Sequence, residues 1–274
     1  MKRQDDGVEQ PRLVASDVDG TLLTPQENVS ARTAQVVARV LAAGVPFVLA
    51  TGRPPRWIPR IAEEAGLDGL AVCANGAVLY DIGRDEIVWA RTLSPMQLHD
   101  IVDAIDSVLD DCTYAVELVG TPKDDRTFVA ELSYTHPWPE GPHSGLTRAE
   151  TLGFPATKLL ARHRNLTSAE MASAINEVLH GEVDLTYSTD HGLIEISVHG
   201  VTKASGLADV AERFGVEREH VIAFGDMPND VEMLTWAGHG VAMANGHEVA
   251  KAAADEVTGP NAEDGVAMVL ERWF

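Results

Sequence analysis

The sequence predicts an α/β fold, in which a Rossmann-like core domain built on a parallel sheet carries an inserted α+β domain. Short apolar runs that end in polar residues or glycine are typical of buried parallel strands, and helical patterns separate these runs. Between residues 84 and 189 the pattern mixes alternating strands with helices, which indicates a second domain. We therefore expect a core domain over residues 11–83 and 190–274, an inserted domain over 84–189, and a disordered lead-in over 1–10.

Composition limits the possible partners. The 274 residues carry a formal net charge of -21, and so acidic a surface repels nucleic acid and anionic membranes, so we expect neither as a partner. No apolar run approaches the roughly 20 residues that span a bilayer. Residues 1–10 lack the apolar core of a signal peptide. Cys73 and Cys112 are too scattered for a disulfide framework or a zinc site, and they fit a reducing cytosol, so we expect a cytoplasmic protein. The oligomeric state does not follow from the sequence.

The first strand is predicted within the stretch LVASDVDGTLL, from Leu13 to Leu23. Its apolar run ends at Asp17 and Asp19, and the following Gly20 allows a tight turn that brings its N–H close to a ligand. Acids just beyond the carboxyl end of a strand are placed for chemistry. A helix cap explains either Asp alone equally well. A calcium loop of the EF-hand type is excluded, because Gly20 follows Asp19 directly.

The second strand ends in a possible phosphate cradle. A helix to about residue 43 precedes this strand, which we expect at residues 45–50. Thr51, Gly52 and Arg53 follow, and two prolines then open another helix. A hydroxyl and unsatisfied N–H groups at a helix start favour an anion. A simple helix cap is an equally good interpretation of Thr51.

The third apolar run, residues 69–73, leads into Asn75 and Gly76. Asn-Gly is a strong hairpin signal, and we expect the flanking strands at residues 78–80 and 86–89. A mere turn is about as good an interpretation of Asn75 as a contact with a substrate.

The inserted domain is predicted to contain two helices and four strands. Its helices are expected at residues 95–109 and 167–180, and its strands at 113–118, 127–134, 156–161 and 183–189. A loop between the second and third of these strands contains His136, Trp138 and His143. We interpret this loop as an exposed connection, because no metal-ligand spacing or triad partner accompanies these residues.

The chain returns to the core with a strand at residues 193–198 and reaches Lys203 at the start of a helix. The helix dipole opposes a lysine there, so we expect an anion to share its site. A further buried strand ends in GDMPND, which places Asp226 at a strand tip and Asn229 and Asp230 at the next helix start. Capping explains either of the last two residues alone but hardly the whole pattern.

The segments DVDGT, TGR, GVTKAS and GDMPND, in this order, resemble the four motifs of the haloacid dehalogenase superfamily. The NGA segment and the C-terminal VAMAN resemble its Cof-like branch, so the resemblance covers nearly the whole chain outside the lead-in. It implies that the inserted domain is a type IIB cap. It also implies a Mg²⁺-dependent phosphatase that hydrolyses small phosphorylated metabolites, of the sugar phosphate, nucleotide or pyridoxal phosphate class, through an aspartyl-phosphate.

The resemblance implies a role for each motif residue. Asp17 would attack phosphorus, Asp19 would act as general acid and base, and Lys203 would neutralise Asp17 and the phosphate. Contacts with phosphate or substrate are expected from Gly20, Thr51, Gly52, Arg53, Asn75 and Asn229. Mg²⁺ prefers oxygen ligands, and those implied here are Asp17, the backbone carbonyl of Asp19, Asp226 and, in direct contact or behind the ligands, Asp230.

Two other functions remain open. A phosphomutase would share the aspartyl-phosphate step but return the phosphoryl group to a bound sugar, so that free phosphate would not accumulate. A non-enzymatic phospho-accepting signalling module would also use Asp17, although an adjacent acid/base such as Asp19 argues against a stable aspartyl-phosphate. A nucleotide-binding Rossmann domain is disfavoured, because no GxGxxG turn follows the first strand.

Overall fold

The structure is a computed structural model that describes residues 9–124, 127–135, 145–187 and 191–274. The chain divides into two compact units. The core unit contains the residues up to Glu86 together with Thr202–Phe274, and the insert unit is Ile87–Val201. The borders of the inserted domain were predicted at residues 84 and 189. Most of the predicted lead-in lies outside the described residues.

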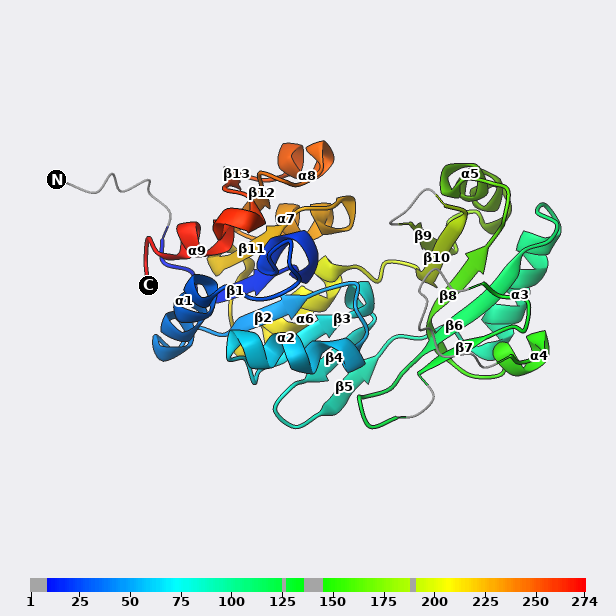
Figure 1. The fold of residues 1–274 in the computed structure, drawn as a ribbon, viewed down its shortest axis with the longest axis horizontal. Coiled ribbons are helices and arrows are strands. Elements are labelled where there is room, and N and C mark those ends of the chain that lie inside the picture. Colours follow the sequence, from blue (N-terminus) through cyan, green and yellow to red (C-terminus); the bar gives the residue numbers. More distant parts are fainter. Residues whose placement is uncertain (1–8, 125–126, 136–144, 188–190) are drawn as a thin grey trace. The chain divides into compact units, whose positions relative to one another are not determined.

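The core unit is built on a mostly parallel sheet with the strand order β13-β12-β11-β1-β2-β3-β4-β5 (Figure 1). The strands of this sheet are β1 (Leu13–Ser16), β2 (Phe47–Ala50), β3 (Leu70–Cys73), β4 (Val78–Asp81), β5 (Glu86–Ala90), β11 (Val221–Gly225), β12 (His239–Met243) and β13 (Glu256–Thr258). Only the first residue of β5 belongs to the core unit, because the insert unit begins at Ile87. Neighbours from β13 to β3 in this order are parallel, and β4 is antiparallel to β3. The predicted α/β class with a parallel core sheet is therefore confirmed.

The central strand, β1, sets the geometry of the site. It is buried along its whole length, and Ser16 is level with Leu49 of β2 and Phe224 of β11. Parallel strands end at the same edge of a sheet, so the residues that follow β1, β2 and β11 meet there. This edge brings together Asp17, Thr51 and Asp226.

The helices of the core unit pack in two groups on opposite faces of the sheet (Figure 1). In one group α1 (Ala31–Ala42) contacts α2 (Ile58–Ala65) and α9 (Gly265–Leu270), and in the other α7 (Val231–Trp236) contacts α6 (Lys203–Phe214) and α8 (Glu248–Ala253). Single helical turns lie at Val18–Leu22, Pro55–Trp57, Ala74–Gly76, Arg218–His220, Pro228–Asp230 and Asn261–Glu263. The Thr202 side chain caps α6 by accepting a hydrogen bond from the N–H of Ser205, which fixes where that helix begins.

The Asn75-Gly76 turn joins different strands from those expected. It connects β3 to β4, with Cys73 paired to Val78, whereas residues 82–85 connect β4 to β5. Asn75 adopts a left-handed conformation, with φ 55° and ψ 34°. The Asn-Gly signal therefore marks the turn correctly, but the strand before the turn is β3, because the chain reverses directly after Cys73.

The insert unit has an antiparallel sheet with the strand order β7-β6-β8-β10-β9. Its strands are β6 (Thr113–Leu118), β7 (Phe128–Ala130), β8 (Ala156–Arg162), β9 (Val183–Thr186) and β10 (Leu193–Val198), and its helices are α3 (Pro95–Asp106), α4 (Arg148–Thr151) and α5 (Ser168–Leu179). Apolar side chains of α3 and α5, such as Leu98 and Ile175, pack with Leu159 of β8 in one buried cluster. This unit therefore has its own hydrophobic core.

The insert unit differs from the expectation in several details, and one of them is the short helix α4, which was not predicted. β10 pairs with both β8 and β9, so the residues from 191 to Val201 lie in this unit and not in the core unit. β7 is shorter than the predicted strand at 127–134, because the backbone N–H of Tyr114 donates its hydrogen bond to the Glu131 side chain. The loop residues His136, Trp138 and His143 lie outside the described residues.

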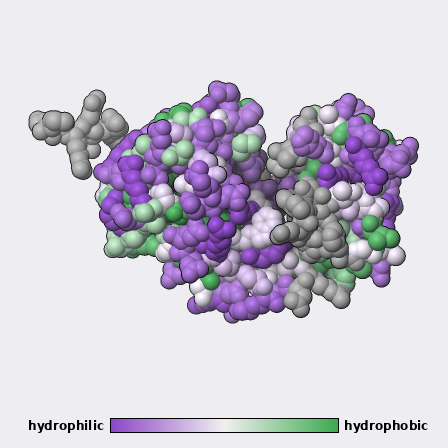
Figure 2. Space-filling view, viewed as in Figure 1, coloured by the Kyte–Doolittle hydropathy of each residue, from purple (hydrophilic) through white to green (hydrophobic). Residues whose placement is uncertain are grey.

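Hydrophilic residues predominate on the face of the molecule shown in Figure 2, and hydrophobic residues are scattered among them. This distribution fits the net charge of -21. Among the helices within the described ranges, none is both long enough and apolar enough to cross a membrane.

The β3–β4 turn packs closely against the start of α6, and substitutions at two glycines can test this packing. A Cβ at Gly76 (φ 100°) would lie 2.0 Å from the carbonyl oxygen of Thr202, whereas a Cβ at Gly215 (φ 62°) would meet nothing within 4 Å. We expect Gly215→Ala to lower the free energy of unfolding by about 1 kcal/mol, the cost of the left-handed backbone alone. Gly76→Ala should cost at least about twice as much, because it adds a backbone clash. Urea denaturation measures both, and equal losses would contradict the close approach.

Candidate active site

Asp17 directly follows β1 and is nearly buried, with 5% of its surface exposed. Its backbone N–H donates to the carbonyl oxygen of Phe224 at 2.9 Å, so β11 fixes its position. Its Oδ1 accepts a hydrogen bond from Nζ of Lys203 at 2.5 Å. Burial raises the pKa of Asp17, and the Lys203 charge opposes this rise. The ammonium of Lys203 therefore helps to keep a buried carboxylate ionised.

Lys203 is the first residue of α6, and only 1% of its surface is exposed. Besides Asp17, its Nζ donates to Oδ1 of Asp230 at 2.7 Å. Burial opposes the charge of Lys203, but the two carboxylates raise its pKa above the ordinary value. They also offset the unfavourable dipole at the helix start. The structure thus places anions beside the lysine whose position had indicated a shared anion site.

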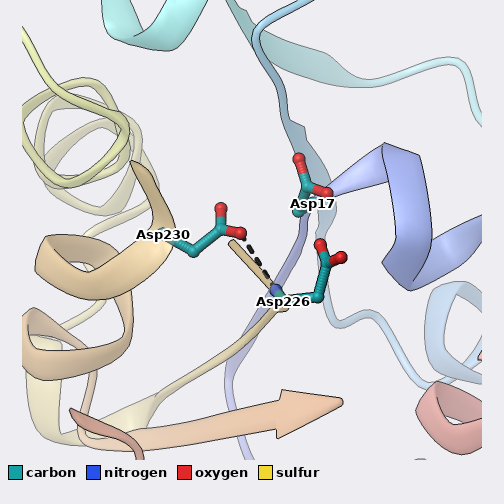
Figure 3. Close-up of side chains that lie close together, drawn as sticks. All are labelled: Asp17, Asp226 and Asp230. Carbon is teal, nitrogen blue, oxygen red and sulfur yellow. Dashed lines mark hydrogen bonds between the residues drawn. The ribbon is translucent and has the colours of Figure 1, made fainter. Parts of the chain in front are cut away.

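Asp226 directly follows β11, and Asp230 completes the turn Pro228–Asp230. Oδ2 of Asp230 accepts hydrogen bonds from the backbone N–H groups of Asp226 and Met227, both at 2.9 Å, and the first of these is drawn in Figure 3. Since Oδ1 of Asp230 accepts from Lys203, both oxygens of this carboxylate are engaged by the protein. The Asp226 carboxylate instead lies beside Asp17 (Figure 3) and accepts a hydrogen bond from Oγ1 of Thr21 at 3.1 Å.

Asp17, Asp226 and Asp230 form a buried acidic cluster, with one oxygen from each within 4.8 Å of the others. These three carboxylates face the one ammonium of Lys203 in this part of the described chain, which leaves two formal negative charges uncompensated. Burial raises the pKa of Asp226 to about 6, and the charge of Asp230 adds to the rise. A set of closely spaced oxygen ligands with excess negative charge suits a hard divalent cation.

Gly20 lets the turn after β1 approach the acidic cluster. It has φ 75°, and a Cβ there would lie 2.3 Å from Oδ2 of Asp226. Its carbonyl oxygen accepts a hydrogen bond from the Asn245 side chain at 2.8 Å. A residue with a side chain at position 20 would therefore push Asp226 out of the cluster.

The residues of the predicted phosphate cradle gather beside the cluster. Thr51 is buried, and its Oγ1 accepts a hydrogen bond from the N–H of Arg53 at 3.1 Å. A Cβ at Gly52 would lie 3.1 Å from Oδ1 of Asn75, and the same oxygen accepts a hydrogen bond from the Asn229 side chain at 3.1 Å. Asn75 thus connects the end of β2 with the turn after β11, and in this structure it orients Asn229.

Arg53 pairs with Asp19. Its Nε donates to Oδ2 of Asp19 at 2.8 Å, and one terminal nitrogen donates to Oδ1 at 2.5 Å. These hydrogen bonds raise the pKa of Arg53, so its guanidinium remains charged. Arg53 was predicted to contact a phosphate or substrate, and in the structure it binds the carboxylate of Asp19.

Three residues outside the predicted site support its loops. Thr21 holds Asp226, and Asn245 holds Gly20. Asn261 donates from its backbone to the Asn245 side chain at 2.8 Å and from its side chain to the carbonyl oxygen of Leu23 at 2.7 Å. Thr21 and Asn245 lie in the segments DVDGT and VAMAN, whose resemblance to the family motifs did not predict these contacts. Asn261 lies in a Gly-Pro-Asn turn, and its sequence carries no signal for this contact.

Comparisons with known proteins cover both units. A family profile described as haloacid dehalogenase-like hydrolase matches residues 14–270. The chain is 31% identical over 269 residues to 5-amino-6-(5-phospho-D-ribitylamino)uracil phosphatase YitU of Bacillus subtilis (strain 168). This match covers 96% of this chain and 98% of that protein. It is 27% identical over 264 residues to pyridoxal phosphate phosphatase YbhA of Escherichia coli (strain K12), over 94% and 97% of the two chains.

A solved structure shares the fold along nearly the whole chain. It is a haloacid dehalogenase-like hydrolase from Bacteroides thetaiotaomicron, with a TM-score of 0.77 and 26% sequence identity. The match covers 97% of this chain and 100% of that one. The sequence and the fold therefore indicate the same family, and the acidic cluster lies within the matched residues.

The raised pKa of Asp226 predicts how the stability of metal-free protein depends on pH. An acid whose pKa is higher in the folded state binds its proton more tightly there, so its contribution to stability is lost as the pH rises from about 4 to about 6. Asp226→Asn keeps the shape of the side chain and removes this charge. In chelator-treated protein we expect the variant to have a higher Tm than the wild type at pH 7 and no advantage at pH 4. A variant that is less stable at pH 7 would contradict the unfavourable burial of this charge.

Proposed function

This chain belongs to the haloacid dehalogenase-like hydrolases, in their Cof-like branch, and from that membership we propose that it is a Mg²⁺-dependent phosphatase that forms an aspartyl-phosphate on Asp17. Its curated relatives are phosphatases, and the chain is a phosphoric monoester hydrolase. The observation that carries the finer proposal is the buried contact of Asp17 with Lys203 at 2.5 Å, beside Asp226. A buried ion pair is weak support for a purely stabilising role, so its place at the strand ends favours chemistry.

In the first step, a carboxylate oxygen of Asp17 forms a bond to phosphorus. The bond from phosphorus to the leaving oxygen breaks, its electron pair stays with that oxygen, and Asp19 supplies a proton to it. A carboxylate and a phosphate ester repel each other, so the site must provide fixed positive charge. Lys203, buried and in contact with Asp17, provides it.

In the second step, a water oxygen attacks phosphorus and gives a proton to Asp19. The bond between phosphorus and Asp17 breaks, and its electron pair restores the Asp17 carboxylate. One difficult displacement is thus divided into two easier ones, and both acids return to their starting state. Asp19 stands two residues after Asp17, in the turn Val18–Leu22, so both side chains come from one short segment.

The residues of the acidic cluster fit Mg²⁺, because all their side-chain ligands are carboxylate oxygens and their charge exceeds that of Lys203. Asp17, Asp226 and the backbone carbonyl of Asp19 would hold the ion. When bound, Mg²⁺ would act as a Lewis acid that stabilises charge on the phosphoryl oxygens. Asp230 is engaged through both oxygens, so we place it behind the ligands, where it orients Lys203 and the backbone of Asp226.

The phosphoryl oxygens would be held by Thr51, the N–H groups of Gly52 and Gly20, Lys203 and Asn229. Charge gathers on these oxygens in the transition state, so donors fixed in advance lower the barrier most. Asn229 is fixed by Asn75, with 3.1 Å between the two side chains. Asn75 therefore contributes to the site mainly by orienting Asn229.

We propose a small phosphorylated metabolite as the substrate. The relatives named above act on 5-amino-6-(5-phospho-D-ribitylamino)uracil and on pyridoxal phosphate, which supports the expected range of sugar phosphates, nucleotides and pyridoxal phosphate. By family membership we also propose that the insert unit serves as a type IIB cap. Cys73 and Cys112 are both free thiols, which supports the proposed cytoplasmic location.

Release of inorganic phosphate from a panel of these metabolites tests the function. We expect repeated turnover with Mg²⁺ and loss of turnover in excess chelator, because the acidic cluster is then left uncompensated. A phosphomutase would consume its substrate without accumulating phosphate, and a phospho-accepting module would release at most one phosphate per chain. Full activity in chelator would contradict the metal assignment.

Asp17→Asn tests the nucleophile. We expect turnover to fall by more than about 1,000-fold, because the amide is a poor nucleophile and nothing else in the mechanism replaces it. The exposed Asp68 provides a matched control, since Asp68→Asn removes the same charge elsewhere in the core unit and should leave the rate unchanged. Wild-type rates in the correctly folded Asp17→Asn variant would defeat the assignment.

A further inference from the structure

Asp19 and Arg53 form a two-point contact between the turn after β1 and the end of β2. Two nitrogens of the guanidinium each donate to a different oxygen of the carboxylate, at 2.8 and 2.5 Å. The Arg53 side chain is 22% exposed and that of Asp19 is 56% exposed. Ion pairs this accessible to solvent contribute little to stability. The value of this contact therefore lies in its geometry, because two parallel hydrogen bonds fix the plane and direction of a carboxylate.

The backbones of both partners are already fixed. The N–H of Arg53 donates to Oγ1 of Thr51 at 3.1 Å, and its carbonyl oxygen accepts from the N–H of Ala74 at 3.0 Å. On the other side, the residue after Asp19 is Gly20, which lies tightly against Asp226. The remaining freedom is the rotation of the Asp19 side chain, and the guanidinium removes it.

We propose that Arg53 is a positioning residue, which aims the Asp19 carboxylate for proton transfer to the leaving group. This inference rests on the proposed function, in which Asp19 is the general acid and base. Proton transfer requires the acid to lie within hydrogen-bond reach of the leaving oxygen. A side chain as exposed as Asp19 would otherwise rotate into water and spend much of its time out of reach.

The contact is compatible with the proton balance of the reaction. Each carboxylate oxygen has two lone pairs, and Arg53 occupies one on each oxygen. The other lone pairs of Asp19 can carry the proton that the leaving oxygen receives in the first step and that water returns in the second. Arg53 itself gains and loses no proton.

The basicity of the leaving group distinguishes a positioning role of Arg53 from a merely structural one. Phenyl phosphate and p-nitrophenyl phosphate have similar shapes, but the phenolate is the more basic leaving group and depends more on protonation. The ratio kcat/KM reports the steps up to the first irreversible one, in which the leaving group departs. We expect Arg53→Ala to lower kcat/KM for phenyl phosphate at least about tenfold more than for p-nitrophenyl phosphate.

A second arm places the change in the Asp19→Asn background. In that background Arg53→Ala should lower kcat/KM for the two esters equally, because Arg53 acts through the side chain that is already lost. Arg53→Lys should recover only part of the rate on phenyl phosphate, since a single ammonium cannot make the two-point contact. Arg60 provides the control: it pairs with Glu64 on the surface of α2 at 3.0 Å, and Arg60→Ala should leave both esters unaffected.

Equal losses on the two esters would overturn the proposal and assign Arg53 to anion binding alone. A larger loss on phenyl phosphate that persists in the Asp19→Asn background would also overturn it. The two levels of inference fail separately. Turnover by Asp17→Asn would defeat the proposed function, whereas an inactive Asp17→Asn together with equal losses for Arg53→Ala would defeat only the role of Arg53.

Discussion

The ammonium of Lys203, buried between Asp17 and Asp230, is the interaction on which the site depends. Charged groups cost several kcal/mol each to bury, and the cost is recovered only if partners and hydrogen bonds are well placed. Here the Thr202 cap fixes the start of α6, and Lys203 is the first residue of that helix. Without this cation, the carboxylates at the ends of β1 and β11 would repel each other in a place with little water. Lys203 therefore makes the cluster possible before any metal or substrate binds.

Close backbone packing is the second requirement of the cluster. A Cβ at Gly20 would meet Asp226, and a Cβ at Gly225 would lie 2.5 Å from the Cβ of Asp230. Both glycines flank the strand ends, so they let the turns after β1 and β11 close on each other. The acids can then share one ion, and the Asp230 carboxylate can accept a hydrogen bond from the backbone N–H of Asp226. Charge and backbone geometry thus support the same arrangement.

The features that the sequence predicted are those set by local patterns and by the parallel sheet. Apolar runs located β1, β2 and β11, and parallel strands necessarily present Asp17, Thr51 and Asp226 at one edge. Partner choice between distant side chains was not predictable, because it depends on rotamers and on the lengths of the turns. The contact of Arg53 with Asp19 and that of Asn75 with Asn229 are of this kind. The assignment of β10 to the core was wrong, since the alternating LIEISV fits a strand of either sheet. The chemical roles of the gathered residues remain predictions.

The most direct measurement is the position of the phosphoryl group during turnover. The protein is mixed with a substrate labelled in its phosphoryl group and quenched in acid within one turnover, and the labelled peptide is sequenced. The account predicts an acid-stable label on Asp17 that is absent in chelator. Release of phosphate in the same quench with no label on the protein, or with the label on another residue, would contradict it.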